Sequence, residues 1–286
     1  MPTADEVLIK VYASGVNPVD WKIREGLRKE KFPTDFPLTL GWDVSGVIEE
    51  MGNDVHNLHL GDKVYSRPDP TRNGTYAEYV TVKADQVGLR PQTLDHVQAA
   101  AVPLSGLTAW QGLFDHGHLE PGQTVLIHAA SGGVGMFAVQ FAKWKGATVI
   151  GTTSTDNVDF VRELGADRVV DYTREKFEDV LQDVDLVLDT LGGDVQKHSI
   201  AVLKNGGRLV TTVKPENLEA AKAKNIHIEG FTAQSYPAQL EQIAQLIDEG
   251  KVHPVIAQVL HLEQAAEAQK ISERGHVRGK IVLKVR

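Results

Sequence analysis

Short apolar runs separated by proline and glycine dominate the first hundred residues, a pattern typical of β-strands joined by irregular connections. From Thr124 the pattern changes, and runs of strand length alternate with stretches of helical periodicity. This alternation predicts an α/β domain with a doubly wound six-stranded parallel sheet. The expected strands are 7–12, 44–50, 61–65 and 75–82 in the first part, and 124–129, 147–152, 167–171, 184–189, 207–212 and 225–230 in the second. Beyond Phe231 we expect a helix around 240–247, a strand over 255–260, a helix near 263–271 and a last strand over 280–285.

The glycine turn after the first of these six strands carries the strongest functional signal. Its sequence is Ala130-x-Gly132-x-x-Gly135, and it lies between a buried apolar run and a helix with an apolar stripe. Backbone N–H groups and the helix dipole at such a turn face an anion, as in dinucleotide-binding βαβ units. We therefore expect Ser131, Gly132, Gly133 and Val134 to bind a pyrophosphate, the alternative being a purely structural turn.

Composition and charge exclude several classes of protein. The chain has 286 residues, enough for two domains, with 42% hydrophobic and 24% charged residues. A formal net charge of −8 and no basic run argue against nucleic acid or an anionic membrane surface as partner. No apolar segment is long enough to span a bilayer and no signal peptide is recognisable, so we expect a cytoplasmic protein. The absence of cysteine excludes disulfides, thiolate catalysis and cysteine-ligated zinc.

Several ordered motifs resemble one known family. They are Gly15-Val-Asn-Pro-Val-Asp20, Gly61-Asp-Lys-Val64, Ala99-Ala-Ala-Val-Pro-Leu-Ser-Gly-Leu-Thr-Ala109, His128–Gly135, Leu164-Gly-Ala-Asp167 and Arg278-Gly-Lys-Ile281. Together they resemble the medium-chain dehydrogenase/reductase superfamily, in its zinc-free, zeta-crystallin-like quinone oxidoreductase branch. The resemblance implies a Rossmann cofactor domain over 105–231, inserted into a β-rich GroES-like catalytic domain formed by 1–104 and 232–286. It also implies a homodimer, and an N-terminal β-hairpin before the strand at 7–12 that this sequence does not contain.

The end of the second strand of the Rossmann domain distinguishes NADH from NADPH. An acid there binds a free ribose 2′-hydroxyl and repels a 2′-phosphate, but Thr152, Thr153 and Ser154 are not acidic. Thr153 and Ser154 therefore favour NADPH. NADH remains the alternative, because Asn157 stands where NADPH-dependent members of the family often have a lysine. These hydroxyls could equally begin the next helix, with Thr155 or Asp156 as its N-cap. The resemblance further places Thr108, Tyr172 and Lys280 near the cofactor, and Leu191 and Phe231 lie at strand ends where open sheets bind ligands.

The resemblance also bears on metal and substrate. Asn17 stands where zinc-dependent relatives carry a cysteine, and Trp42-Asp43 stands where they carry a histidine–glutamate pair. We therefore expect no metal, and we interpret His128 as a core residue. Without a Lewis acid, the expected reaction is hydride transfer from NADPH to a quinone or an α,β-unsaturated carbonyl.

Candidate substrate-site residues are Asn17, Asp20 and Trp42. The Asn17 amide would donate to the developing oxyanion, unless Asn17 is only a turn former before Pro18. Asp20 and Asp43 could lie near the same cleft, the alternative being a helix cap or a surface acid. Tyr76 and Tyr236 are possible proton donors without a spacing argument. The alternative function is an NADPH-binding redox sensor or scaffold without turnover.

Overall fold

The computed structural model describes residues 1–33 and 37–286 and divides the chain into two compact units. Unit 1 comprises residues 1–107 and 234–286, and unit 2 comprises residues 108–233. Each unit contains one β-sheet with its own buried core.

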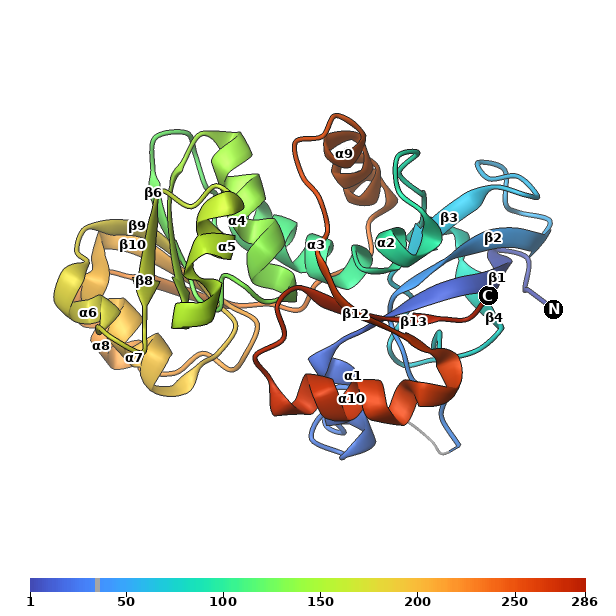
Figure 1. The fold of residues 1–286 in the computed structure, drawn as a ribbon, viewed down its shortest axis with the longest axis horizontal. Helices are drawn as coiled ribbons and strands as arrows, with labels where there is room; N and C mark the ends of the chain where they lie inside the picture. Colours follow the sequence, from blue (N-terminus) through green and yellow to red (C-terminus); the bar gives the residue numbers. More distant parts are fainter. Residues whose placement is uncertain (34–36) are drawn as a thin grey trace. The chain divides into compact units, whose positions relative to one another are not determined.

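Unit 2, all of whose residues are described, contains a six-stranded parallel sheet in the order β11-β10-β9-β6-β7-β8. The order reverses at the neighbouring strands β6 and β9, as in a doubly wound sheet. Helices α6, α7 and α8 lie on the opposite face of the sheet from α4 and α5 (Figure 1). The elements are β6 (Thr124–Ile127), α4 (Gly133–Lys145), β7 (Thr148–Thr153), α5 (Val158–Glu163), β8 (Arg168–Asp171), α6 (Phe177–Val180), β9 (Val184–Asp189), α7 (Gly193–Val202), β10 (Leu203–Thr211), α8 (Leu218–Ala223) and β11 (His227–Gly230).

The strands of unit 2 read as apolar runs because both faces of the sheet are covered. Leu126, Val187 and Leu209 point to one face, where they join Phe177 of α6 and Ile200 of α7 in a buried cluster. Gly151 of β7 faces α5 on the other side, where a Cβ would lie 2.8 Å from the Val161 side chain. The fold class expected from the alternation of strands and helices is confirmed.

The described residues of unit 1 form a seven-stranded sheet in the order β12-β13-β1-β2-β3-β5, with β4 also paired to β1. All pairs are antiparallel except β12 with β13. The strands are β1 (Glu6–Val16), β2 (Val44–Met51), β3 (Lys63–Ser66), β4 (Tyr79–Lys83), β5 (Val87–Leu89), β12 (Ile256–His261) and β13 (Lys280–Lys284). Valines and isoleucines on alternate positions of β1, β2, β3 and β4 form the core between them.

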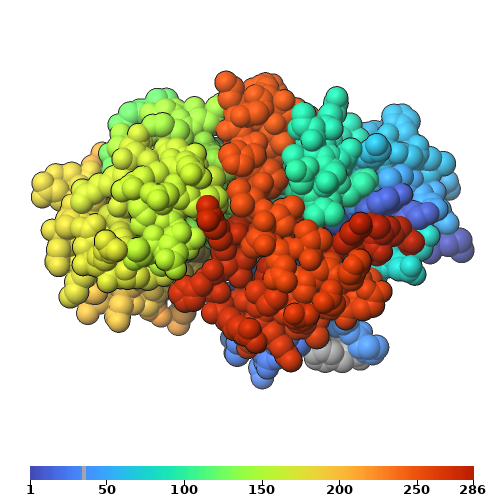
Figure 2. All heavy atoms as spheres, viewed as in Figure 1, coloured from blue at the N-terminus to red at the C-terminus, as the bar shows by residue number. Residues whose placement is uncertain are grey.

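Short helices flank this sheet: α1 (Pro18–Arg24), α2 (His96–Ala100), α9 (Pro237–Asp248) and α10 (Ala265–Arg274), while α3 (Pro103–Trp110) runs from unit 1 into unit 2. Helices α1 and α10 lie side by side, and Arg24 Nη1 donates to Gln269 Oε1 over 2.8 Å (Figure 1). In Figure 2 the orange and red atoms of residues 237–286 cover much of the visible face of unit 1. The two ends of the chain thus build one sheet, and β13 places Lys280 beside the end of β1.

Some predicted boundaries were wrong. The strand expected over 75–82 begins only at Tyr79, because Thr75 and Tyr76 bond to Gly41 and Leu40 through backbone groups instead of entering the ladder. Helix α1 was not predicted, since its seven residues are too few to show a periodic stripe. Its start at Pro18 follows the preference of proline for the first turn of a helix.

Candidate functional site

The glycine turn has the geometry of an anion-binding corner. Strand β6 ends at Ile127, Ala129 takes a left-handed conformation (φ 50°), and α4 begins at Gly133. A Cβ on Gly135 would lie 2.2 Å from the Ala129 carbonyl oxygen, so no other residue fits there without moving the backbone. The first N–H groups of α4 have no acceptor inside the helix, and they point with its positive dipole end toward the turn. These groups fit the pyrophosphate of a dinucleotide.

Strand β7 supports this turn from the neighbouring position in the sheet. Thr153, its last residue, is 1% exposed, and its hydroxyl donates to Ser131 Oγ over 2.9 Å. The proton of the Ser131 hydroxyl therefore stays available for an external acceptor. The structure thus brings together Ser131 and Thr153, two residues that were predicted for different parts of the cofactor.

His128 is held inside the sheet by two hydroxyls. Its Nδ1 lies 3.1 Å from Thr152 Oγ1 and its Nε2 lies 2.9 Å from Ser199 Oγ. Because the Ser199 hydroxyl donates to the Val195 carbonyl, Nε2 is the donor and Nδ1 the acceptor. Burial lowers the pKa of His128 to about 4, so the ring is neutral at physiological pH. These contacts support the interpretation of His128 as a core residue.

The alternative interpretation of the turn after β7 was that it begins the next helix, with Thr155 or Asp156 as N-cap. A 3-10 turn does begin at Thr155, but its N-cap is Ser154 and that of α5 is Asn157, while Thr155 Oγ1 donates to Asp171 Oδ2 over 2.6 Å. Asn157 Nδ2 donates to Ser154 Oγ over 3.1 Å, which leaves the Ser154 proton free to donate elsewhere. Local hydrogen bonds between the ends of β7 and β8 therefore replace helix capping here.

An acid does lie beside Thr153, on the neighbouring strand. Asp171 of β8 is its partner in the sheet register. Its carboxylate is occupied by Thr155, Thr173 and Arg174, whose Nε is 3.3 Å from Oδ2. Hydrogen bonds from Thr155 and Thr173, with the charge of Arg174, lower the pKa of Asp171. Sequence reasoning did not identify Asp171 or Arg174, although both flank the predicted Tyr172.

The remaining predicted cofactor residues of unit 2 differ in exposure. Tyr172 is 50% and Leu191 53% exposed, at the ends of β8 and β9. Phe231 follows β11 and is 8% exposed, its ring 4.6 Å from that of His116. Thr108 lies in α3 and is 7% exposed. The structure places all four near the carboxyl end of a strand or in α3, and their contact with a cofactor stays a prediction.

Unit 1 contains a buried polar cluster, here called the Lys280 cluster, formed by Asn17, Asp20, Asp43, Tyr76 and Lys280. The Lys280 ammonium donates to the Val16 carbonyl over 3.1 Å, to Asn17 Oδ1, and to Asp43 Oδ2 over 3.2 Å. Asn17 Nδ2 donates to the same Asp43 oxygen over 2.8 Å. All three ammonium hydrogens thus have protein acceptors, and the cation and the acid fix the orientation of the Asn17 amide.

Asp20 connects this cluster to Tyr76. Its Oδ2 accepts from the Asn17 N–H over 2.8 Å and from the Tyr76 hydroxyl over 2.5 Å. Its Oδ1 is buried and has no hydrogen-bond partner among the described residues. Burial raises the pKa of Asp20 to about 7, against the hydrogen bonds from Tyr76 and Asn17, which lower it. The Asp20 carboxyl is therefore partly protonated and partly ionised near neutral pH.

Asp43 is as deeply buried, but it is better compensated. Its Oδ1 accepts from the Leu104 N–H over 2.6 Å, and its Oδ2 faces Lys280 and Asn17. Burial raises its pKa, while the charge of Lys280 and the Asn17 amide oppose this rise. Asp43 and Lys280 form the buried ion pair of the cluster.

The structure places the other candidates of unit 1 outside the hydrogen bonds of this cluster. Trp42 precedes Asp43, is 1% exposed, and its Nε1 has no partner within the described part of the chain. Tyr236 is 50% exposed and is the N-cap residue of α9. Lys280 was predicted from the resemblance to lie near the cofactor, and no sequence signal indicated that it bonds to Asn17 across 263 residues. Only strand pairing between the two ends of the chain brings them together.

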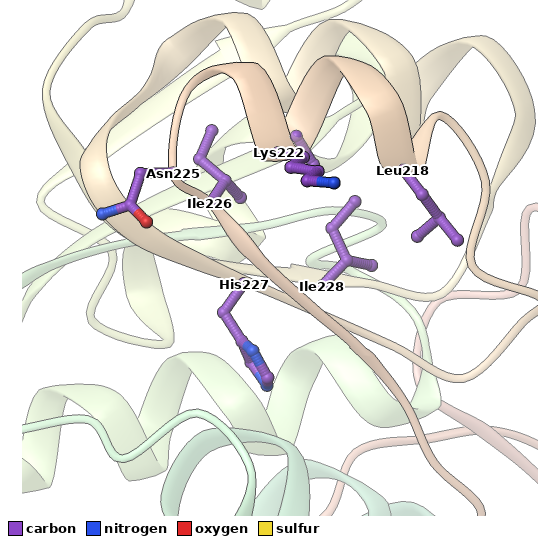
Figure 3. Close-up of a pocket in the computed structure, with 7 residues that line it drawn as sticks. Leu218, Lys222, Asn225, Ile226, His227 and Ile228 are labelled. Atoms are coloured by element: carbon purple, nitrogen blue, oxygen red, sulfur yellow. The ribbon is translucent and has the colours of Figure 1, made fainter.

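The outer edge of the sheet in unit 2 carries a shallow pocket of about 260 Å³. Leu218 and Lys222 of α8 and Ile226, His227 and Ile228 at β11 line it (Figure 3). It lies at the amino end of β11, whereas ligands of open parallel sheets bind at the carboxyl ends of the strands. The pocket is therefore separate from the glycine turn.

The Lys280 cluster contains a cation, the Lys280 ammonium, but the side chains of the cluster do not resemble the ligands of a zinc site. Among residues 1–33 and 37–286, no group of three or more histidine, cysteine, aspartate or glutamate side chains is arranged to hold a metal. The Lys280 ammonium lies between Asn17 and Asp43, the residues at the family's zinc-ligand positions. The donors are an amide, a carboxylate, a carbonyl and an ammonium, and they do not fit zinc.

One unit with a doubly wound sheet and an anion-binding turn, and a second, β-rich unit with a buried polar cluster, are the two domains expected of a dehydrogenase. Comparison with known proteins agrees. Residues 3–92 match the family profile described as alcohol dehydrogenase GroES-like domain, and residues 164–283 match the profile described as zinc-binding dehydrogenase. The chain belongs to the medium-chain dehydrogenase/reductase superfamily, in its quinone oxidoreductase branch, as the sequence motifs predicted.

Individual relatives cover almost the whole chain. Mouse NAD(P)H oxidoreductase RTN4IP1, mitochondrial, is 37% identical over 98% of this chain and 82% of its own length. The NADPH-dependent alkenal/one oxidoreductase, chloroplastic, of Arabidopsis thaliana is 34% identical over 98% of this chain and 72% of its own. A solved quinone oxidoreductase from Coxiella burnetii superposes with a TM-score of 0.92 at 38% identity, over 100% of this chain and 92% of its own.

No helix among the described residues is long and apolar enough to cross a membrane. The relatives' names include mitochondrial and chloroplastic proteins, so the expected cytoplasmic location stays a prediction.

Proposed function

We propose that this protein is a zinc-independent, NADPH-dependent oxidoreductase that transfers hydride to a quinone or an α,β-unsaturated carbonyl. The observation that carries the proposal is the Asn17 amide. Lys280 and Asp43 hold it in one orientation, and one Nδ2 hydrogen has no acceptor among the described residues. A preoriented donor of this kind is what a developing enolate or quinol oxygen requires.

The hydride itself is the chemistry that a bound nicotinamide supplies. The protein binds the pyrophosphate through the first N–H groups of α4 and through Ser131. The Asn17 amide then stabilises negative charge on the acceptor oxygen. The Lys280 cation also attracts this charge, and because Lys280 is buried, water screens the attraction only weakly. An acceptor that is already electrophilic needs only this orientation and hydrogen bonding, whereas a simple alcohol would need a metal.

The Lys280 cluster supports zinc independence. A zinc ion at these positions would have to displace an ammonium group that is already bonded to Asn17 and Asp43. Like charges in one buried site repel strongly, so the two cations exclude each other.

The end of β7 supports NADPH over NADH. Ser154 keeps a hydroxyl proton for a phosphate oxygen, and Arg174 is a nearby exposed cation with 74% of its side chain accessible. The acid of this region, Asp171, is already bonded to Thr155 and Thr173. Its charge is therefore partly satisfied and opposes a 2′-phosphate less than a free acid would.

The names of the relatives support the same class of reaction. RTN4IP1 is named as an NAD(P)H oxidoreductase, and the Arabidopsis relative as an NADPH-dependent alkenal/one oxidoreductase. The Coxiella relative is named as a quinone oxidoreductase. We infer that this chain is an oxidoreductase that uses a nicotinamide cofactor, with one or both acceptor classes as substrates.

The test is oxidation of NADPH by EDTA-treated protein, with phenanthrenequinone and a 2-alkenal as acceptors. We expect turnover to survive EDTA, and Asn17→Ala to lower kcat about 100- to 1000-fold, the usual effect of removing one oxyanion donor. Asn205→Ala, an exposed position on β10, is the matched control. Saturable NADPH binding without any acceptor turnover would instead favour the redox sensor or scaffold.

We also propose that the protein is a homodimer. Strand β11 is an edge strand that pairs only with β10 among the described residues. An exposed parallel edge is well suited to pair with a second copy across a two-fold axis. Light scattering after size-exclusion chromatography should give twice the mass of 31.3 kDa, and Ile228→Lys should reduce it to the monomer. A monomer for the unaltered protein would contradict the dimer.

A further inference from the structure

Arg67 is a buried arginine that the proposed reaction does not use. It follows the last residue of β3, Ser66, and is only 6% exposed. Its backbone is fixed on both sides, because Ser235 donates to its carbonyl oxygen and Pro68 follows. Its Nε is buried without a hydrogen-bond partner, and among the described residues no carboxylate forms an ion pair with its guanidinium.

Two acids whose charges act on Arg67 are bonded to other groups. Burial lowers the pKa of Arg67, while the charges of Asp43 and Asp69 raise it. Both Asp43 oxygens are already bonded, Oδ1 to the Leu104 N–H and Oδ2 to Asn17 and Lys280. Asp69 Oδ1 accepts from the N–H and the hydroxyl of Thr71, each over 2.8 Å. Neither acid forms an ion pair or a hydrogen bond with the Arg67 guanidinium.

An uncompensated buried charge is costly, and arginine stays protonated in proteins. Groups of this kind are usually paired with an anion, and the planar fork of arginine matches a carboxylate or phosphate through two parallel hydrogen bonds. Among residues 1–33 and 37–286 no carboxylate forms an ion pair with Arg67. A ligand can supply the missing anion.

We propose that Arg67 binds an anionic group, a carboxylate or a phosphate, that the acceptor carries in addition to its reducible carbonyl. The proposal rests on the proposed function. Because Ser66 pairs with Val44 in the sheet, Arg67 follows in the register opposite Asp43, a member of the Lys280 cluster, where the proposed function has Asn17 donate to the acceptor oxygen. The cofactor is the less suitable source of the anion, because the glycine turn of unit 2 already provides N–H donors for its pyrophosphate.

The experiment compares two acceptors, benzylideneacetone and its para-carboxylate. The quantity measured is the ratio of kcat/KM for the carboxylate to kcat/KM for the neutral enone, so differences in intrinsic reactivity cancel between variants. Arg67→Met keeps the unbranched apolar part of the side chain without the charged guanidinium, and Arg67→Lys keeps the charge without the fork. Arg90→Met is the matched control, since Arg90 Nε also lacks a partner but Arg90 lies near Asp248.

We expect Arg67→Met to lower the ratio about 10- to 100-fold, as loss of a charge-assisted hydrogen bond does, and Arg67→Lys to restore part of it. The Arg90→Met variant should leave the ratio unchanged. A ratio that Arg67→Met does not change would overturn the proposal. A rise in KM for NADPH with an unchanged ratio would likewise overturn it and assign the anion to the cofactor.

A second measurement separates this proposal from the proposed function. If the unaltered protein reduces neither acceptor, the proposed function fails, and anion binding is then measured without turnover. Benzoate and inorganic phosphate, each compared with chloride at equal ionic strength, should raise the Tm of the unaltered protein. At least one of them should raise it more in the unaltered protein than in Arg67→Met. Equal shifts in both proteins would overturn the anion site even where turnover is absent.

Discussion

Asp20 gives the sharpest test of the electrostatics of the Lys280 cluster. Its side chain is fully buried, its Oδ2 accepts from Asn17 N–H and Tyr76, and its Oδ1 has no partner among the described residues. The substitution Asp20→Asn keeps an acceptor oxygen for both hydrogen bonds, removes the ionisation and puts an NH2 group in place of the buried Oδ1. We therefore expect it to change the pH dependence of stability rather than the fold.

The magnitude follows from the pKa of Asp20, which burial raises from 3.8 to about 7. At 1.36 kcal/mol per pH unit this displacement corresponds to at most about 4 kcal/mol. Between these two values the folded protein keeps the proton and the unfolded chain has lost it. The contribution of Asp20 to stability is therefore fully present below pH 3.8 and is lost as the pH rises through about 7.

Two histidines act in the opposite direction over part of this window. Burial lowers the pKa of His96 and His128 from 6.5 to about 4, so each contributes stability that increases as the pH rises toward 6.5. The total pH profile of the unaltered protein therefore mixes both signs. The difference between Asp20→Asn and the unaltered protein isolates Asp20, because both proteins contain both histidines.

The assay is urea unfolding of both proteins at several values from about pH 5 to 8. The stability of Asp20→Asn relative to the unaltered protein should rise by about 2.3 kcal/mol between pH 5 and pH 7 and level off above about pH 8. Asp159→Asn, on a side chain that is 89% exposed, should show no such trend. A stability difference that does not change with pH would refute the assignment of a raised pKa to Asp20.

Three further predictions test other contacts. Gly135→Ala should lower Tm and abolish NADPH binding, because its Cβ would lie 2.2 Å from the Ala129 carbonyl oxygen. In Gly132→Ala the same distance is 3.3 Å, so this variant should bind NADPH with an affinity much closer to that of the unaltered protein; equal affinities of the two variants in calorimetric titration would contradict this. Lys280→Met should lower the free energy of unfolding in urea by about 3–5 kcal/mol, since it leaves Asp43 buried without its cation. A smaller loss of stability than in an exposed Lys→Met control would count against the ion pair. Ser154→Asp should raise KM for NADPH at least tenfold relative to KM for NADH, and an unchanged ratio would argue against a 2′-phosphate near Ser154.

The cofactor-binding unit could be predicted well from sequence because its signals are local. Three of these signals lie within about twenty consecutive residues: the apolar run of β6, the turn at Gly132 and Gly135, and the apolar stripe of α4. Each is recognised from residue type and spacing alone. The six strands of the sheet were predicted from the alternation of short apolar runs and stretches of helical periodicity. Hydrogen bonds between strand ends, such as Thr155 to Asp171, were missed because their partners come from different strands.

The substrate side could be predicted only in part. Asn17 and Asp20 lie in one short motif, but their partner Lys280 comes from the last strand, and nothing in the spacing of residues indicates that pairing. A lysine at a strand end is usually solvated. Arg67 was missed for the same reason, since only the structure shows that no carboxylate among the described residues pairs with it.

Direct transfer of a labelled hydride tests the central claim most directly. Metal-depleted protein is incubated with NADPH deuterated at the transferable position of the nicotinamide and with a 2-alkenal, and the product is analysed by mass spectrometry and NMR. We predict one deuterium at the β-carbon of the saturated aldehyde, and a product yield that falls about 100- to 1000-fold in Asn17→Ala. A reduced product without deuterium, or no product while NADPH is bound, would contradict the account.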